Sequence, residues 1–340
     1  MSTNRSIAGT RVAVMGAGAV GSYFGGMLAR AGAKVTLIAR AAHAEAIRRD
    51  GLFIDSVAFQ ERVAVEAATD ASGARDAGFV LFCVKTLDNE EAARALAAHL
   101  AAGAIVVSLQ NGVDNVERIR AAAGIDALPS VVYVAAAMQP GRVKHSGRGD
   151  LIVGELRGSA QATSTAGPAG QRAERVSALF AAAGVQCKVS GNIEGDLWTK
   201  LIMNCAGNAV TALGRASYGR AAKEPKTREV MSRLIEETVA VARAAGVNLP
   251  NVNLVETGLK LAETLGDATS STAQDIARGK RTEIGSLNGY VVRRGLELGV
   301  ATPVNTTLDA LVTLLEQSAA REIVEKQGAA EATRRAGGAQ

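Results

Sequence analysis

Aromatic side chains are scarce in this chain of 340 residues, where Phe, Trp and Tyr together make up 3% of positions. Proteins that bind single-stranded nucleic acids stack the bases on such side chains, so a basic excess without them argues against that function. The excess is small, with 38 Lys and Arg against 33 Asp and Glu and a formal charge of +5. We therefore expect no nucleic-acid partner and favour small anionic ligands.

Cysteine is rare as well. Cys83, Cys187 and Cys205 are odd in number and far apart, and they show neither a disulfide framework nor the spacing of metal ligands. This distribution predicts reduced thiols, a cytoplasmic protein and no metal site.

Charge is absent from one stretch, Val12 to Ala29, which follows Arg5 and Arg11 and so resembles a signal sequence or a short membrane span. The stretch contains five glycines, which would weaken a helical membrane anchor but suit a strand, a turn and a helix. We therefore expect no membrane partner.

The length favours two domains, at roughly 150 residues for each. As far as about Val189, short β-type runs alternate with helical patterns, which is typical of a parallel sheet covered by helices. We predict an α/β fold with a Rossmann-type, doubly wound sheet in residues 1–190. The expected strands are residues 11–16, 33–39, 77–84, 104–110, 130–138, 150–155 and 185–189, and runs near Leu52 and Val63 suggest a further hairpin or linker.

The second half of the chain lacks β-type runs. Its apolar residues recur at helical spacing, which predicts an all-α domain in residues 191–325. Residues 326–340 have no sustained apolar stripe and are expected to fray. The predicted helices are residues 197–213, 227–246, 253–265, 283–299 and 304–318.

A glycine motif, G-x-G-x-x-G, stands between the first predicted strand and the following helix. Its first glycine permits a tight turn, the second lets a pyrophosphate approach the backbone, and the third allows close packing of helix and strand. The surrounding βαβ pattern favours a dinucleotide site over an ordinary glycine-rich turn. The cofactor-binding candidates of this motif are Gly16, Ala17, Gly18, Ala19, Val20 and Gly21.

The second predicted strand ends in TLIAR, with Arg40 where an NAD site usually has an acidic residue for the ribose. A guanidinium can pair with a 2′-phosphate, so this position favours NADP(H) as the cofactor. The alternative is that Arg40 is a solvated residue at a strand end.

Two further strand ends carry polar residues, Lys85 in FCVKT and Asn111 in SLQNG. Ligands of open α/β sheets bind beyond the carboxyl ends of the strands, which makes both residues candidates for the site. Alternatively, QNG is an ordinary turn and Lys85 a solvated strand end.

The segment LWTKLIMNCAGNAVTAL carries Lys200, Asn204 and Asn208 at every fourth position, so that a helix would align them on one face. A solvated polar stripe is the alternative, although such stripes favour better helix formers than Asn. In the later segment SSTAQDIARGKRTEIGSLNG, Ser271 and Gln274 match a capping box, and Glu283 stands where an acid favours a helix N-terminus. Taken alone, these residues therefore favour structural roles over a place in the site.

With these motifs in this order, from about Arg11 to at least Thr307, the chain resembles the 2-dehydropantoate 2-reductase, or ketopantoate reductase, family. The resemblance rests on G-x-G-x-x-G, VKT, QNG, WTKLIMNCAGNAVTAL and STAQDIARGKRTEIGSLNG. It implies a Rossmann domain, a helical domain and NADPH-dependent reduction of the 2-keto group of ketopantoate to (R)-pantoate, a step of pantothenate biosynthesis.

The resemblance also implies roles for individual residues. Lys200 corresponds to the catalytic lysine, which would stabilise the alkoxide left by hydride transfer and protonate it as a general acid. Glu283 is implied as catalytic and near the cofactor, Lys85 as a cofactor-side residue, and Asn111 as a contact of both cofactor and substrate. The implied substrate contacts are Asn111, Asn204, Asn208 and Ser271.

Three alternatives stay open. The substrate could be a related 2-oxo acid. The protein could be a 3-hydroxyacid dehydrogenase, which also places Lys and Asn four residues apart, although Ser271 and Glu283 have no evident place in that pattern. It could also be a catalytically silent NADP-binding protein. The expected partner is a small 2-oxo acid, and the expected assembly a monomer or homodimer.

Overall fold

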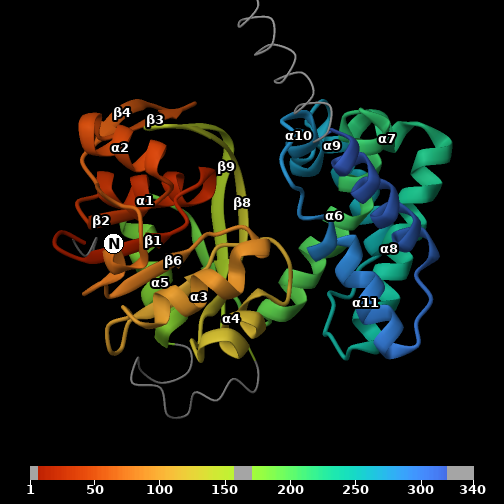
Figure 1. Cartoon of the computed structure of the whole chain (residues 1–340). Helices are drawn as coiled ribbons and strands as arrows, with labels where there is room; N and C mark the ends of the chain where they lie inside the picture. Colours follow the sequence, from red (N-terminus) through yellow and green to blue (C-terminus); the bar gives the residue numbers. More distant parts are fainter. Residues whose placement is uncertain (1–6, 157–170, 320–340) are drawn as a thin grey trace, which may run out of the picture. The chain divides into compact units, whose positions relative to one another are not determined.

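The computed structural model describes residues 7–156 and 171–319, so the predicted tail at 326–340 lies outside the described residues. The chain divides into two compact units, Met1–Leu197 and Trp198–Gln340. The sequence pattern had placed the domain boundary after residue 190. The division falls inside one long helix, and each unit is described by itself below (Figure 1).

Unit 1 is built on a ten-stranded sheet in the order β4-β3-β9-β8-β7-β6-β1-β2-β5, with β10 beside β9. The six neighbours from β8 to β5 are parallel, as predicted for the Rossmann-type core. The strands are β1 (Arg11–Met15), β2 (Lys34–Ile38), β3 (Leu52–Ser56), β4 (Gln60–Val63), β5 (Glu66–Ala68), β6 (Phe79–Phe82), β7 (Ile105–Ser108), β8 (Leu128–Gln139), β9 (Arg142–Val153) and β10 (Cys187–Val189).

Helices cover both faces of this sheet. In β1, Val14 packs in one hydrophobic cluster with Phe24 and Phe180, whereas its neighbour Ala13 belongs to another cluster with Leu96. Because side chains alternate across a strand, the two clusters lie on opposite faces, which confirms the doubly wound prediction. The helices are α1 (Ala19–Arg30), α2 (Ala41–Asp50), α3 (Asn89–Ala97), α4 (Asn115–Ala123) and α5 (Gln171–Ala182), with 3₁₀ turns η1 (Ala71–Ala74) and η2 (Thr86–Asp88).

The sheet is longer than the sequence predicted. The strand expected at 150–155 is the end of β9, which begins at Arg142 and pairs antiparallel with β8 along most of its length. The segment RVKHSGRG was not recognised because its polar residues and glycines hide the strand pattern. β9 also pairs in parallel with β3 and β10, and β3 and β4 form the suggested hairpin. The short strand β5 was missed.

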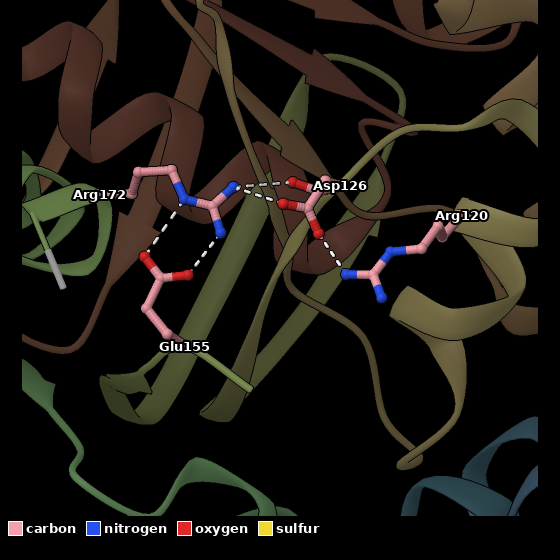
Figure 2. A network of polar contacts seen from close by, with 4 residues as sticks. All are labelled: Arg120, Asp126, Glu155 and Arg172. Atoms are coloured by element: carbon pink, nitrogen blue, oxygen red, sulfur yellow. Dashed lines mark hydrogen bonds and ion pairs between the residues drawn. The ribbon is translucent and has the colours of Figure 1, made fainter. Parts of the chain in front are cut away.

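An ion network around the buried Arg172 ties α5 to α4 and to the segments that follow β9 and precede β8 (Figure 2). Arg172, in the first turn of α5, is 4% exposed and holds Glu155 beyond β9 through two nitrogen–oxygen contacts. Its Nη1 also donates to Asp126 Oδ2 at 3.0 Å and to the Asp126 carbonyl at 3.1 Å. Asp126 accepts a further bond from Arg120 of α4. The network fixes the start of α5 and the approach to β8.

Unit 2 is helical, as predicted, and no helix among residues 7–156 and 171–319 is long and apolar enough to cross a membrane. The single helix predicted over 283–299 is wrong, because Leu287 has φ −108° and ψ −100° and interrupts it. The elements are α6 (Ile193–Gly214), α7 (Tyr218–Lys223), α8 (Pro225–Ala244), α9 (Leu254–Leu265), α10 (Ser271–Ala277), η4 (Ile284–Ser286), α11 (Asn288–Leu298) and a helix over 303–319.

Candidate active site

The glycine turn in unit 1 has the geometry that a dinucleotide site requires. Gly16 has φ +88°, and a Cβ there would lie 2.7 Å from the backbone nitrogen of Val84. A Cβ on Gly21 would lie 2.7 Å from Val14 Cγ1, whereas one on Gly18 would meet no atom within 4 Å. The first and third glycines thus permit close packing, and the second leaves open space for a phosphate to approach the backbone.

Backbone bonds hold this turn against the end of β2. The N–H groups of Gly16 and Ala17 donate to the carbonyl of Ile38 at 3.2 and 2.8 Å. Arg40 follows two residues later as the N-cap of α2, and its side chain is exposed. The guanidinium of Arg40 is therefore carried by the same strand end that anchors the glycine turn.

His43, which the sequence motifs did not single out, is connected to the glycine turn by hydrogen bonds. The backbone N–H of Gly141 donates to His43 Nδ1 at 3.0 Å, so in the neutral ring Nε2 carries the hydrogen. Nε2 then donates to Ser22 Oγ at 3.0 Å, and that hydroxyl donates to the Ala17 carbonyl at 3.2 Å. His43 thus links the β8–β9 turn to the glycine turn, a long-range contact with no local sequence signal.

This contact predicts a pH dependence of stability. Burial lowers the pKa of His43 below its usual 6.5, so the unfolded chain binds a proton first as the pH falls. The contribution of neutral His43 is complete above the unfolded pKa and is lost as the pH falls toward the folded one. We expect the urea midpoint of wild type to fall between about pH 7.5 and about pH 5.5, and His43→Gln to weaken that fall. A His99→Gln control should retain it; equal pH dependence in wild type and His43→Gln would contradict the expectation.

The strand ends that carry Lys85 and Asn111 are joined by buried amides. Gln110 Nε2 donates to the Val84 carbonyl at 2.9 Å and to Asn89 Oδ1 at 3.0 Å, so it bridges the ends of β6 and β7. Asn115 Nδ2 donates to the Asn111 carbonyl at 2.7 Å. Because Val84 also packs against Gly16, unit 1 gathers the glycine turn, Arg40, Lys85 and Asn111 at one edge of its sheet.

In unit 2 the predicted polar face lies on α6. Lys200 and Asn204 are partly exposed, whereas Asn208 is only 2% exposed, so the face is not an ordinary solvated stripe. On the adjacent side, Cys205 and Ala209 are fully buried, and burial raises the pKa of the Cys205 thiol. The polar face thus lies beside a buried side of α6, and its Asn208 end is itself buried.

The capping role that was the alternative to substrate binding for Ser271 is wrong. The N-cap of α10 is Ser270, which is 1% exposed and whose Oγ accepts from the Ala273 N–H at 3.0 Å. Ser270 Oγ also accepts from Thr211 Oγ1 at 2.8 Å and donates to the Asn208 carbonyl at 3.3 Å, both on α6. Ser271, exposed as the first residue of α10, is therefore carried next to the Asn208 end of the polar face.

Glu283 does not start a long helix. It precedes the 3₁₀ turn η4, and its side chain forms no cap hydrogen bond there. The loop is held by Thr282, whose N–H and Oγ1 both donate to Glu316 Oε2 at 2.7 Å. Ile284 packs against Ala209, so Glu283 is also brought toward the second half of α6. Unit 2 thus carries Lys200 and Asn204 on α6 and directs Ser271 and Glu283 toward the Asn208 end of this helix.

With this geometry in view, comparison with known proteins decides the family. The profile of the family described as ketopantoate reductase PanE/ApbA matches residues 12–158, and the profile of its C-terminal domain matches residues 192–316. The chain belongs to the ketopantoate reductase family. The predicted resemblance is confirmed, and the protein is an oxidoreductase of this family.

Curated relatives agree with the assignment. The chain is 35% identical to a 2-dehydropantoate 2-reductase from Halobacterium salinarum over 90% of its length and 99% of the relative's. It is 34% identical to the enzyme of that name from Archaeoglobus fulgidus, covering 90% and 98% of the two chains.

Solved structures give the same picture. A PanE/ApbA family ketopantoate reductase from Ralstonia eutropha JMP134 superposes with a TM-score of 0.82 at 46% identity, covering 91% of this chain and 99% of that one. A structure of D-mandelate dehydrogenase with NADH and anilino(oxo)acetate has a TM-score of 0.80 at 23% identity, over 91% of this chain and 99% of that one, which shows the fold alone.

Proposed function

We propose that the protein is a 2-dehydropantoate 2-reductase that reduces the 2-keto group of ketopantoate to (R)-pantoate with NADPH, as a step of pantothenate biosynthesis. The observation that carries the proposal is the polar face of α6, where Lys200, Asn204 and Asn208 recur beside a buried side of the helix in a chain of this family. We further propose that it acts in the cytoplasm, as a monomer or homodimer.

NADPH supplies the hydride when bound, and the residues of the chain orient the substrate and donate a proton. Lys200 stabilises the negative charge that develops on the C2 oxygen and donates its Nζ proton to it. Asn111, Asn204, Asn208 and Ser271 can hold the oxygen atoms of the substrate through hydrogen bonds. Glu283 belongs with these residues as a catalytic and cofactor-side carboxylate, and Lys85 adds a cation on the cofactor side.

The proposed preference for NADP(H) over NAD(H) depends on Arg40. An exposed guanidinium at the end of β2 can pair with the 2′-phosphate, which NAD(H) lacks. We expect Arg40→Ala to lower kcat/KM for NADPH by about 10- to 100-fold, since a hydrogen bond to a charged group contributes about 1.5–3 kcal/mol. The value for NADH should change little. Arg49→Ala, which removes an exposed guanidinium from the same helix, should leave both values near wild type; an unchanged NADPH value in Arg40→Ala would contradict the assignment.

A substrate panel tests the proposed reaction. NADPH oxidation is followed with ketopantoate, with other 2-oxo acids and with 3-oxo acids, at matched concentrations. The proposal expects the highest kcat/KM for ketopantoate. A higher value for another 2-oxo acid would reassign the substrate, a preference for 3-oxo acids would indicate the 3-hydroxyacid dehydrogenase alternative, and no turnover would indicate a silent binding protein.

A further inference from the structure

Tyr218 is not among the residues that the sequence motifs singled out, yet it contacts the polar face of α6. Its Oη donates to Asn208 Oδ1 at 2.7 Å. Its ring lies against Gly207, where an added Cβ would be only 2.5 Å from Tyr218 Cε1. A glycine on α6 thus lets the ring approach closely enough for the hydroxyl to reach the neighbouring asparagine.

The position of Tyr218 is fixed by its backbone. Its N–H donates to the Ala268 carbonyl at 3.0 Å, and the next N–H, of Gly219, donates to the Gly266 carbonyl at 2.8 Å. The loop that holds α7 in this way leads directly to Ser270, which contacts Thr211 and the Asn208 carbonyl. Asn208 is therefore held at two points: its backbone carbonyl accepts from Ser270, and its side-chain oxygen accepts from Tyr218.

The hydrogen bond from Tyr218 determines which group of the Asn208 amide, the oxygen or the nitrogen, is left for another partner. An amide oxygen accepts and an amide nitrogen donates, and here the oxygen accepts from the partly buried hydroxyl of Tyr218. Burial raises the pKa of Tyr218 to about 12, so that the hydroxyl keeps its proton near neutral pH. The nitrogen of Asn208 then remains as the group for other partners.

We propose that Tyr218 is a positioning residue that orients the Asn208 amide, so that Nδ2 donates to an acceptor oxygen of the 2-oxo acid. This inference rests on the proposed function and deepens it. It makes Asn208 a donor toward the anionic substrate, and it assigns the orientation to a residue whose side chain need not touch the substrate. Without the hydroxyl, the amide can rotate and present its oxygen, which an anion repels.

The test begins with Tyr218→Phe, which removes the hydroxyl and keeps the ring on Gly207. We expect KM for ketopantoate to rise about tenfold, in line with the loss of one hydrogen-bond orientation of about 1.4 kcal/mol. kcat and KM for NADPH should stay within about twofold of wild type, because Tyr218 takes no part in proton or hydride transfer. Asn208→Asp keeps an acceptor for Tyr218 but replaces the donor by a charge, so KM should rise further than in Tyr218→Phe.

A double-mutant cycle separates orientation from structural support. In an Asn208→Ala background, Tyr218→Phe should have no further effect on KM, because the amide that it orients is gone. Thr227→Val is the matched control, because it removes a hydroxyl that donates to Ala221 of α7 without reaching Asn208, and it should leave KM unchanged.

The outcomes distinguish the two proposals. An unchanged KM in Tyr218→Phe, or effects that add in the double variant, overturns the role of Tyr218 while wild-type turnover of ketopantoate still supports the proposed function. A rise of KM in Thr227→Val equal to that in Tyr218→Phe also overturns it, since loosening of α7 would then explain both. No wild-type turnover of ketopantoate overturns both proposals.

Discussion

Lys200→Ala is expected to lower kcat for ketopantoate reduction by about 10²- to 10⁴-fold, the usual contribution of a positioned general acid. The variant loses both the cation opposite the developing alkoxide and the proton that completes the reaction. Because Lys200 is partly exposed on α6, its truncation should not unfold unit 2. Steady-state NADPH oxidation measures the loss, and circular dichroism checks that the fold is retained.

Two further variants sharpen this result. Lys200→Arg keeps a positive charge but has a guanidinium that does not give up its proton, so its kcat should stay well below wild type if proton donation matters. Lys260→Ala removes an exposed lysine from α9 and should behave as wild type. Full kcat in Lys200→Ala would show that the alkoxide is protonated by another group.

Arg172→Met is expected to lower the free energy of unfolding of unit 1 by about 3–5 kcal/mol, because it leaves the Glu155 carboxylate without its buried partner and Asp126 with Arg120 alone. Glu155 and Asp126 both pair with Arg172, which is 4% exposed (Figure 2). Urea unfolding should be followed by far-UV circular dichroism, since the single tryptophan, Trp198, belongs to unit 2.

Two further variants serve as controls for this prediction. Arg172→Met combined with Glu155→Gln also removes the carboxylate charge that has lost its guanidinium partner and should recover part of the loss. Arg233→Ala breaks an exposed ion pair with Glu229 and should cost no more than about 1 kcal/mol. A loss in Arg172→Met as small as that in Arg233→Ala would mean that water reaches the network and screens it.

Local patterns were sufficient for the parts of the fold that depend on neighbouring residues. The glycine spacing identified the turn, because the positive φ at Gly16 and the close contact of α1 with β1 at Gly21 both require glycine. The spacing of Lys200, Asn204 and Asn208 likewise identified their common helix face. The first part of strand β9 was missed because its residues are polar. Pairing with β8, β3 and β10 stabilises the strand instead, and these partners are distant in the sequence.

Residues that act through long-range contacts could not be found in this way. His43 lies 98 positions from Gly141, and nothing near either residue predicts their bond. Tyr218 lies only 10 positions from Asn208, but its contact depends on the turn between α6 and α7 and on the absence of a side chain at Gly207. The cap of α10 was misplaced by one residue because Gln274 stands three positions after Ser271, as in a capping box, whereas the N-cap is the adjacent Ser270.

The most direct measurement is product analysis with the purified protein, NADPH and ketopantoate. The proposed reaction requires that NADPH is consumed and that (R)-pantoate, identified by chiral chromatography, forms in equal amount, with a far lower rate in Lys200→Ala. NADPH consumption without (R)-pantoate, or no consumption at all, would contradict it.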